Sequence, residues 1–341
     1  MLYLFNWGGL DHELEVTVPE AYRGWRMTDL HGTFARNAAT GLIKVRIPSQ
    51  APAACLLTRG DPAAYAARLR PPHEKAWRRL VELNEERDTG RPKVLWAHEK
   101  HYYPYILDRF DAFGCEARQV PATEWTPELL AGCKVAVIAE AGTDEKIKRM
   151  LARKDFVPML VDWVKGGGSL FLLGHSGGTI NAYGNVLRAI ANPFGLNGEW
   201  MSLARDPAHR DPAFGDPRQI RAPVCPESVA AEPELLAGVK EVSLYALSPM
   251  KKTRNGAARG IVTIPASAEE HAGEIAMGAV DFGKGRVFVS ADTMFCQPFR
   301  IGFADNAALL ENIVGWLLRA SVTDEMRRSF RNGLFIDRDQ E

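Results

Sequence analysis

The residues best suited to chemistry lie in the segment Gly174-His175-Ser176-Gly177-Gly178. This segment matches Gly-x-Ser-x-Gly, the nucleophile elbow, a motif that follows a strand. A serine nucleophile needs a base to accept its proton and backbone N–H groups to stabilise an oxyanion. Ser176 is the candidate nucleophile, with His175 beside it. The alternative is that the glycines simply allow the loop to turn tightly.

Further downstream, three residues could assist Ser176. His209 and His271 are candidate bases, and Asp292 follows the last apolar strand. A short motif without demonstrated partners is a weak indication of catalysis, because geometry decides whether the groups cooperate. The hydrolase hypothesis therefore rests on Ser176, His175 and Asp292, and the structural loop remains the alternative.

A second polar group consists of His98, Glu99, His101 and Tyr102, which follow the first predicted strand of the second half. This spacing is not His-Glu-x-x-His and the group lies in a predicted loop, so we expect no metal site. Tyrosine rings stack on sugar faces, and His and Glu side chains bond hydroxyl groups. We favour a surface loop with an aromatic lid, and the functional interpretation is a loop that contacts sugar. The complete predicted ligand set is His98, Glu99, His101, Tyr102, Glu140, Gly177, Gly178 and Asn181.

Glu140 and Asp292 follow two different predicted strands, and parallel strands bring their carboxyl ends to one sheet edge. The two carboxylates could act as acid and base. The alternative for Asp292 is that it bonds local N–H groups, as Asp commonly does in turns. We favour this alternative for Asp292.

The elements that must position these residues are clearest in the stretch Val157–Thr179. Val157, Leu160, Val161 and Val164 have the spacing of one apolar helix face. Gly166–Gly168 end this helix, and Ser169–Leu173 is an apolar run typical of a strand covered on both faces. The reactive loop thus follows a buried strand.

The same alternation of strand and helix continues over residues 92–320. Predicted strands are Lys93–Ala97, Glu116–Val120, Lys134–Ala139 and Arg286–Ser290, and predicted helices are Tyr102–Phe113, Tyr183–Ile190 and one that Asp305 caps. Residues 197–275 form an insertion with antiparallel strands such as Val242–Ala246 and Gly260–Ile264. This pattern predicts an α/β fold with a parallel sheet and helices on both faces.

Residues 1–60 differ, because apolar and polar residues alternate in Leu14–Val18 and Ile43–Ile47. Such alternation predicts about four antiparallel strands, exposed on one side. Residues 61–91, rich in Ala, Arg, Glu and Leu, predict a helical connector, with a helix from His73 to Glu86. Residues 321–341 are a polar appendage.

The amino-acid composition limits the kinds of function that we expect. The chain of 341 residues is 46% hydrophobic and 25% charged with zero formal net charge, so neither nucleic acid nor membrane binding is expected. Its N-terminus lacks the regions of a signal peptide. The five scattered cysteines indicate free thiols in a reducing compartment, and we expect a cytoplasmic protein without a cofactor.

Two longer stretches resemble a known superfamily. They are FVPMLVDWVKGGGSLFLLGHSGGT and GKGRVFVSADTMFCQPFRIGFADNAALLENIVGWLL. Both resemble the flavodoxin-like, class I glutamine-amidotransferase-like superfamily, in particular its DUF4350-like branch and the GIFT domain of an intraflagellar transport protein. The resemblance implies a flavodoxin-like sheet. Ser176 stands on the loop where amidotransferases carry a cysteine nucleophile, so amidotransferase activity is not expected.

The N-terminal 60 residues are similar to the last strands of the β-sandwich that ends many glycoside hydrolases. YLFNW, RMTDLHGT and VRIPSQAPAACLLTR carry this similarity. It implies a partial sandwich and a carbohydrate-related role. We therefore expect a non-catalytic accessory unit that binds sugar or forms a homo-oligomer or larger glycosidase-like assembly. The alternatives are a serine hydrolase and a protein-interaction scaffold.

Overall fold

The protein is described here from a computed structural model, in which the chain divides into the units Met1–Arg79 and Leu80–Glu341. The structure describes residues 2–5, 12–18, 20, 26–29, 34–36, 42–47, 52–58, 90–97, 104–139, 149–150, 152–174, 189–198, 204–211, 218–224, 226–245, 247–254, 256–296, 300–324 and 326–327. The predicted helices His73–Glu86 and Tyr183–Ile190 lie mostly or wholly outside these residues.

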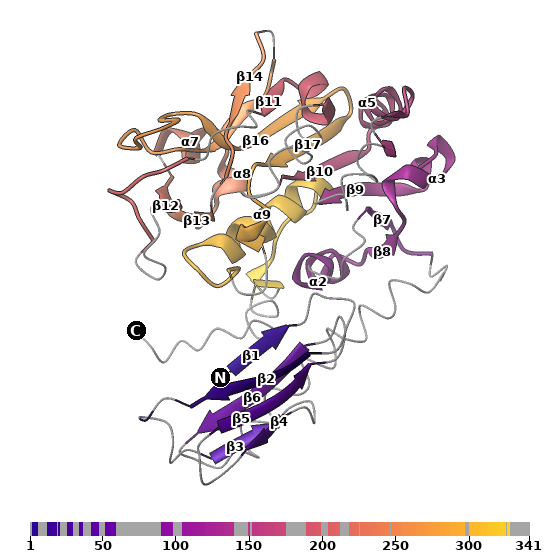
Figure 1. Cartoon of the computed structure of the whole chain (residues 1–341). Coiled ribbons are helices and arrows are strands. Elements are labelled where there is room, and N and C mark those ends of the chain that lie inside the picture. The colour runs from indigo at the N-terminus through magenta and orange to yellow at the C-terminus, as the bar shows by residue number, and fades with distance from the viewer. Residues whose placement is uncertain are drawn as a thin grey trace. The chain divides into compact units, whose positions relative to one another are not determined.

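The N-terminal unit consists of two three-stranded antiparallel sheets (Figure 1). One has the order β1-β6-β3 and the other β2-β5-β4. The strands are β1 (Leu2–Phe5), β2 (His12–Thr17), β3 (Arg26–Asp29), β4 (Phe34–Arg36), β5 (Leu42–Ile47) and β6 (Pro52–Thr58). The sequence predicts about four strands. The prediction gives two strands too few, because it relies on alternation of apolar and polar residues, which runs such as Leu2–Phe5 and Phe34–Arg36 lack.

The alternation predicted for β5 is present in the structure. Ile43, Val45 and Ile47 are buried, whereas Lys44 and Arg46 are exposed. The apolar face predicted around β2 is less well covered: Leu14 is 45% exposed and Val16 is half-buried, while Val18, directly after the strand, is buried. β2 is an edge strand, so its side chains have a neighbouring strand on one side.

The second unit is built on a nine-stranded mixed sheet with the order β11-β14-β16-β17-β10-β9-β7-β8, and β15 also pairs with β16. Its five parallel strands are β7 (Lys93–Trp96), β8 (Glu116–Gln119), β9 (Cys133–Ala139), β10 (Ser169–Leu173) and β17 (Gly285–Ser290). The other members are β11 (Leu196–Gly198), β14 (Met250–Lys252), β15 (Arg259–Thr263) and β16 (Ile275–Phe282). The five parallel strands lie within two residues of the predicted positions.

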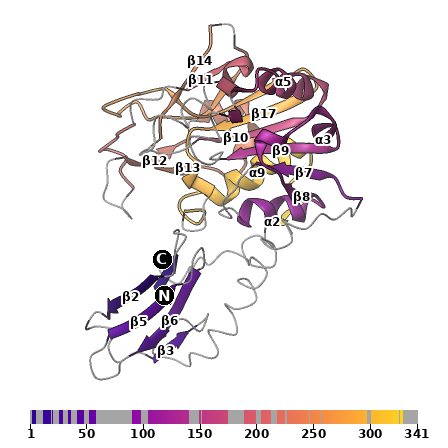
Figure 2. The same cartoon turned by 45° about the vertical axis from the view of Figure 1, so that its right-hand side comes forward.

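Helices cover both faces of this sheet (Figures 1 and 2). α2 (Pro104–Ala112) and α9 (Asn306–Leu318) lie on one face, while α3 (Pro127–Ala131) and α5 (Phe156–Gly166) lie on the other. α9 packs on β9, β10 and β17, which explains why its described side chains from Leu309 to Leu317 are all buried. The short 3-10 helices are η2 (Ala122–Glu124), η3 (Asn192–Phe194) and η4 (Met294–Cys296).

The predicted insertion does not form a separate body. Its strands β11, β14 and β15 join the main sheet through antiparallel pairs, so the sheet is mixed and the expectation of a parallel sheet holds for one part of it. The remaining strands β12 (Gln219–Pro223) and β13 (Glu241–Tyr245) form a two-stranded sheet beside α7 (Pro226–Ala231) and α8 (Pro233–Leu236).

Residues beyond α9 dock on that helix. Arg327 donates one hydrogen bond to the buried Glu311 (3.1 Å) and another to Oδ1 of Asn312 (2.7 Å). Asn312 in turn donates to the carbonyls of Leu235 and Ala237, both at 3.0 Å. Arg327 of the predicted appendage thus contacts α9, and Asn312 of α9 joins this helix to the end of α8.

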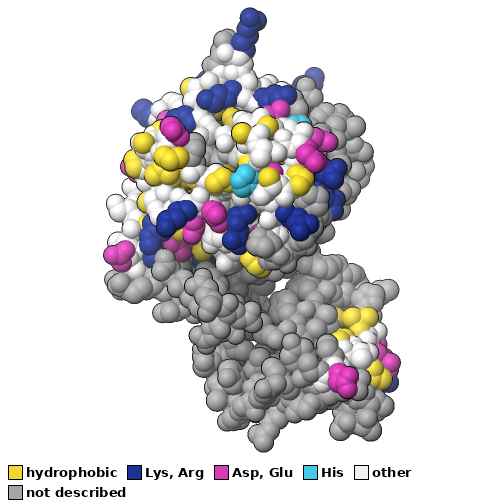
Figure 3. Space-filling model, turned by 90° about the vertical axis from the view of Figure 1, so that its left-hand side faces the viewer, with side chains coloured by type: hydrophobic (Ala, Val, Ile, Leu, Met, Phe, Trp, Pro, Cys, Tyr) yellow, Lys and Arg dark blue, Asp and Glu magenta, His cyan; other side chains and the backbone are white. Residues whose placement is uncertain are grey.

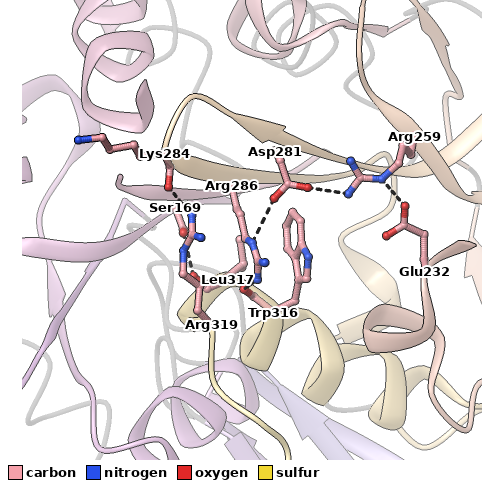
Figure 4. A network of polar contacts seen from close by, with 9 residues as sticks. All are labelled: Ser169, Glu232, Arg259, Asp281, Lys284, Arg286, Trp316, Leu317 and Arg319. Carbon is pink, nitrogen blue, oxygen red and sulfur yellow. Dashed lines mark hydrogen bonds and ion pairs between the residues drawn. The ribbon is translucent and has the colours of Figure 1, made fainter. Parts of the chain in front are cut away.

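A polar network closes the end of α9, where helix carbonyls lack intrahelical partners (Figure 4). Ser169 donates from Oγ to the Leu317 carbonyl at 2.7 Å, and Arg286 donates to the Trp316 carbonyl at 2.6 Å. The Arg286 guanidinium also lies 4.9 Å from the Trp316 ring centroid and bonds Asp281. The starts of β10 and β17 are thus fastened to the carboxyl end of α9.

We expect Ser169→Ala to lower the free energy of unfolding by about 1–3 kcal/mol, because the buried Leu317 carbonyl then loses its donor. Urea unfolding monitored by circular dichroism measures this change. The matched control is Glu15→Gln, which removes the Lys44–Glu15 ion pair whose side chains are 70% and 56% exposed. That change should cost less than about 1 kcal/mol. Equal stability losses in the two variants would contradict the role assigned to Ser169.

Candidate functional site

The candidate site lies at the carboxyl ends of β7, β9, β10 and β17, which the parallel pairing brings to one edge. Two backbone hydrogen bonds extend this ladder beyond the strands. Ala97 N–H donates to the Val137 carbonyl at 3.0 Å, and Gly174 N–H donates to the Ser290 carbonyl at 2.8 Å. The loops that carry the predicted residues therefore leave the sheet from neighbouring strands.

Most of the predicted site residues lie outside the described residues. They are His175, Ser176, Gly177, Gly178 and Asn181 after β10, His98, Glu99, His101 and Tyr102 after β7, and Glu140 after β9. Their roles stay predictions. The strands that precede them are adjacent in the sheet, as the sequence interpretation requires.

Asp292 is the predicted site residue whose surroundings the structure describes. It follows β17 and is fully buried. Its Oδ2 accepts a hydrogen bond of 2.7 Å from the Tyr245 N–H in β13. Nearby, Ser290 Oγ donates to the Asp292 carbonyl (2.6 Å) and accepts from the Asp292 N–H (3.2 Å). The carboxylate therefore connects the end of β17 to a strand of the insertion.

Arg300 supplies the positive charge in this region. Its side chain is buried, its guanidinium lies 4.6 Å from the Tyr245 ring centroid, and its Nη2 donates to Gln219 Oε1 at 2.6 Å. Burial lowers the pKa of Arg300, and the charges of Asp292 and Asp211 act in the opposite direction. Buried charges are stable when they compensate one another and are hydrogen-bonded. The negative charges of Asp292 and Asp211 offset part of the cost of burying the Arg300 guanidinium.

Asp211 and Asn306 complete what we call the Asp292 cluster: Asp211, Gln219, Ser243, Tyr245, Asp292, Arg300 and Asn306. Ser243 Oγ donates to Asp211 Oδ2 at 2.7 Å, and its N–H donates to Asn306 Oδ1 at 2.9 Å. Asn306 Nδ2 donates to the carbonyls of Ser243, Phe295 and Arg300. Within the Asp292 cluster, Asp211, Asp292 and Asn306 are fully buried, and each bonds a neighbouring side chain or the backbone.

The sequence assigned the helix cap to Asp305, and the structure changes its role. Asp305 is the N-cap residue of α9, but its side chain makes no capping bond. Instead its Oδ2 accepts from the N–H groups of Lys240 (2.7 Å) and Glu241 (3.1 Å). Asp305 thus joins Asn306 in holding β13 against the start of α9.

The two later histidines considered as bases each bond a carboxylate in or next to the insertion. His209 Nδ1 lies 2.9 Å from Asp206 Oδ2 and 2.8 Å from Ser267 Oγ. His271 Nδ1 lies 2.9 Å from Glu274 Oε2. Nδ1 is engaged in both histidines, and Nε2 of His271 is buried, so the assistance predicted for Ser176 would have to come from Nε2 of His209.

The described residues contain no group of three or more His, Cys, Asp or Glu side chains able to hold a metal ion, and no helix among them is long and apolar enough to cross a membrane. On the face shown in Figure 3, basic and acidic side chains are interspersed rather than separated into a stripe. A basic stripe is the usual footprint of a nucleic-acid site.

The buried cysteines should be unreactive in the folded protein. Burial raises the pKa of the Cys115 and Cys133 thiols above the ordinary value of 9.0. Because the thiolate is the nucleophile, we expect negligible alkylation of either cysteine by iodoacetamide at pH 8, and full alkylation in urea. Mass spectrometry of the alkylated peptides measures both. Equal labelling with and without urea would contradict the burial of these thiols.

Comparison with known proteins shows likeness of fold. No family model matches the sequence, and no curated protein does. The mmIFT52 N-terminal domain matches with a TM-score of 0.51 at 12% identity, over 68% of this chain and 99% of that domain. The cytoplasmic protein STM1381 from Salmonella typhimurium LT2 matches with a TM-score of 0.47 at 14% identity, over 66% and 99%. A beta-galactosidase from Bacillus circulans sp. alkalophilus matches with a TM-score of 0.39 at 12% identity, over 67% and 31%.

Proposed function

We propose that this chain is a non-catalytic accessory unit of a carbohydrate-active, glycoside hydrolase-like system, and that it binds sugar or assembles with further copies. The observation that carries the proposal is the burial of Asp292, whose carboxylate bonds the backbone of β13. A general acid or base must reach its substrate within hydrogen-bond distance. Asp292 is fully buried and its Oδ2 is bonded to the Tyr245 N–H, so it serves as a structural anchor.

The kind of loop at this edge supports a binding role. In the amidotransferase-like superfamily that the sequence resembles, the nucleophile is a cysteine, and this chain carries Ser176 on the corresponding loop. A bound ligand would contact the segment after β7, where imidazole, carboxylate and phenol groups can bond hydroxyls and stack on a sugar ring. His98, Glu99 and Tyr102 are the residues we assign to that contact, with Glu140 and Asn181 from the adjoining loops.

The N-terminal unit supports the carbohydrate association. It consists of antiparallel sheets, as the resemblance to the terminal sandwich of glycoside hydrolases implies. β2 presents Leu14 at an edge of one sheet, 45% exposed. Edge strands are common sites of pairing with other chains. The assembly part of the proposal places contact between copies at this edge.

Saccharide binding and self-association test the proposal together. We expect a glycan array to identify a sugar that calorimetry confirms, and Tyr102→Ala to weaken its affinity about tenfold, the loss of a stacking contact. The control is Lys252→Ala, at an exposed position of β14. Light scattering coupled to size exclusion measures the mass in solution, and Leu14→Glu should reduce any assembly. A chain that is monomeric and retains no saccharide would contradict the proposal.

A further inference from the structure

Among its described residues, the second unit carries two imidazole–carboxylate pairs with the same three-residue spacing, one more exposed than the other. In the first pair, His209 Nδ1 lies 2.9 Å from Asp206 Oδ2 and the imidazole is 40% exposed. In the second, His271 Nδ1 lies 2.9 Å from Glu274 Oε2 and the imidazole is 11% exposed. His271 Nε2 is buried without a hydrogen-bond partner. The pairs thus differ in whether Nε2 can be reached.

Asp206 holds His209 in one orientation. Its Oδ1 accepts from the N–H groups of Ala208 (3.0 Å) and His209 (3.3 Å), so the carboxylate is fixed by its own turn. Its Oδ2 accepts from Ser267 Oγ at 3.0 Å, in the loop between β15 and β16. Asp206 is fully buried, so it remains behind the imidazole rather than in contact with solvent.

These contacts settle which nitrogen carries the proton. Ser267 Oγ and Asp206 Oδ2 both lie within hydrogen-bond distance of Nδ1. An ionised carboxylate can only accept hydrogen bonds, so Nδ1 must be the donor. Ser267 therefore cannot transfer its proton to Nδ1, and the three residues do not form a serine-protease triad, in which Ser and Asp contact different ring nitrogens. The free lone pair is on Nε2.

We propose that Nε2 of His209 is a phosphoryl-acceptor site, modified by small donors of the phosphoramidate or acyl-phosphate class. A carboxylate on Nδ1 fixes the tautomer and the orientation of the ring, as it does for histidines that bind metals, and leaves the Nε2 lone pair free.

The step is a displacement at phosphorus. The Nε2 lone pair forms the N–P bond while the bond from phosphorus to the donor's leaving group breaks. At neutral pH the nitrogen of phosphoramidate is already protonated, so it takes the P–N bond pair and departs as ammonia. The ring becomes cationic as the bond forms, and Asp206, which already accepts the Nδ1 proton, stabilises that charge. No redox change occurs.

The test uses the full chain with potassium phosphoramidate at neutral pH, followed by peptide mass spectrometry under conditions that preserve phosphohistidine. We expect modification of His209 and none of His271, whose Nε2 is buried. Asp206→Asn, which keeps the side-chain shape, should slow the modification of His209 about tenfold. His209→Gln should abolish the modified peptide, and circular dichroism confirms that each variant is folded.

A comparison with the unfolded chain keeps the proposal falsifiable if Asp206→Asn does not fold. In urea the two histidines should react at similar rates. Folding should accelerate the reaction of His209 severalfold and suppress that of His271. If solvent exposure were the sole determinant of reactivity, His209 would react no faster in the folded chain than in the unfolded chain. That result, or an unmodified His209, or an Asp206→Asn variant that reacts at the original rate, would overturn the proposal.

Discussion

Gly285→Ala should unfold the second unit or lower its free energy of unfolding by about 4 kcal/mol or more. A Cβ at Gly285 would lie 2.2 Å from the carbonyl oxygens of both Gly168 and Val164. These atoms belong to the backbone at the end of α5 and the start of β10, and cannot rotate away as a side chain can. The backbone must shift where β17 enters the sheet, beside the contact of Ser169 with α9. Urea unfolding by circular dichroism measures the loss.

Gly132→Ala is the matched control for this prediction. A Cβ at Gly132 would lie 3.7 Å from the Leu129 carbonyl oxygen, an ordinary contact, and its φ of −78° suits any residue. We expect a change of less than about 1 kcal/mol, because alanine also reduces the entropy of the unfolded chain. Were Gly285→Ala as stable as Gly132→Ala, the close packing of α5 against β17 would be wrong.

Asp292→Ala should cost about 3–5 kcal/mol of stability, the usual effect of removing one partner of a buried charge pair. The Tyr245 N–H would lose its 2.7 Å acceptor, and the buried Arg300 would lose one of the two carboxylates that compensate its charge. Asp292→Asn keeps an acceptor oxygen in place and removes the charge, so its cost should be smaller. Thermal and urea unfolding of the two variants measure the difference.

Asp281→Asn is the control for Asp292. Asp281 bonds both Arg259 and Arg286, but its side chain is 52% exposed, so solvent screens these pairs. The change should cost less than about 1 kcal/mol. If Asp292→Ala were as stable as Asp281→Asn, Asp292 would be free for another task. The structural interpretation of the Asp292 cluster would then be contradicted.

The sheet could be predicted where burial alone determines the pattern. Ser169–Leu173 is a strand at the predicted residues, because a strand covered on both faces is a continuous apolar run. β16 was missed, although Ile275–Phe282 is also largely apolar and buried. The sequence feature that could have indicated β16 is the turn that joins it to β17, in which Gly283 has a φ of +62°. A Gly-Lys-Gly turn after Phe282 indicates a hairpin, and hairpins make the sheet mixed.

The candidate site was less predictable for a physical reason. The sequence placed Asp292 after β17, as the structure does, but its main partner is the N–H of Tyr245, and backbone groups leave no trace in side-chain patterns. Arg300 and Asp211 were not singled out, because neither belongs to a motif and the chain between them is long. Their pairing follows from the way the insertion folds back on α9, which sequence spacing does not encode.

Turnover by the purified full chain is the most direct test of the central claim. The substrates are p-nitrophenyl glycosides and p-nitrophenyl esters, compared with Ser176→Ala and Asp292→Asn, and a fluorophosphonate probe reports on Ser176 directly. A non-catalytic unit should release product at the uncatalysed rate in all three proteins, and Ser176 should remain unlabelled. Release well above background that Ser176→Ala abolishes, together with labelling of Ser176, would contradict the account and establish a serine hydrolase.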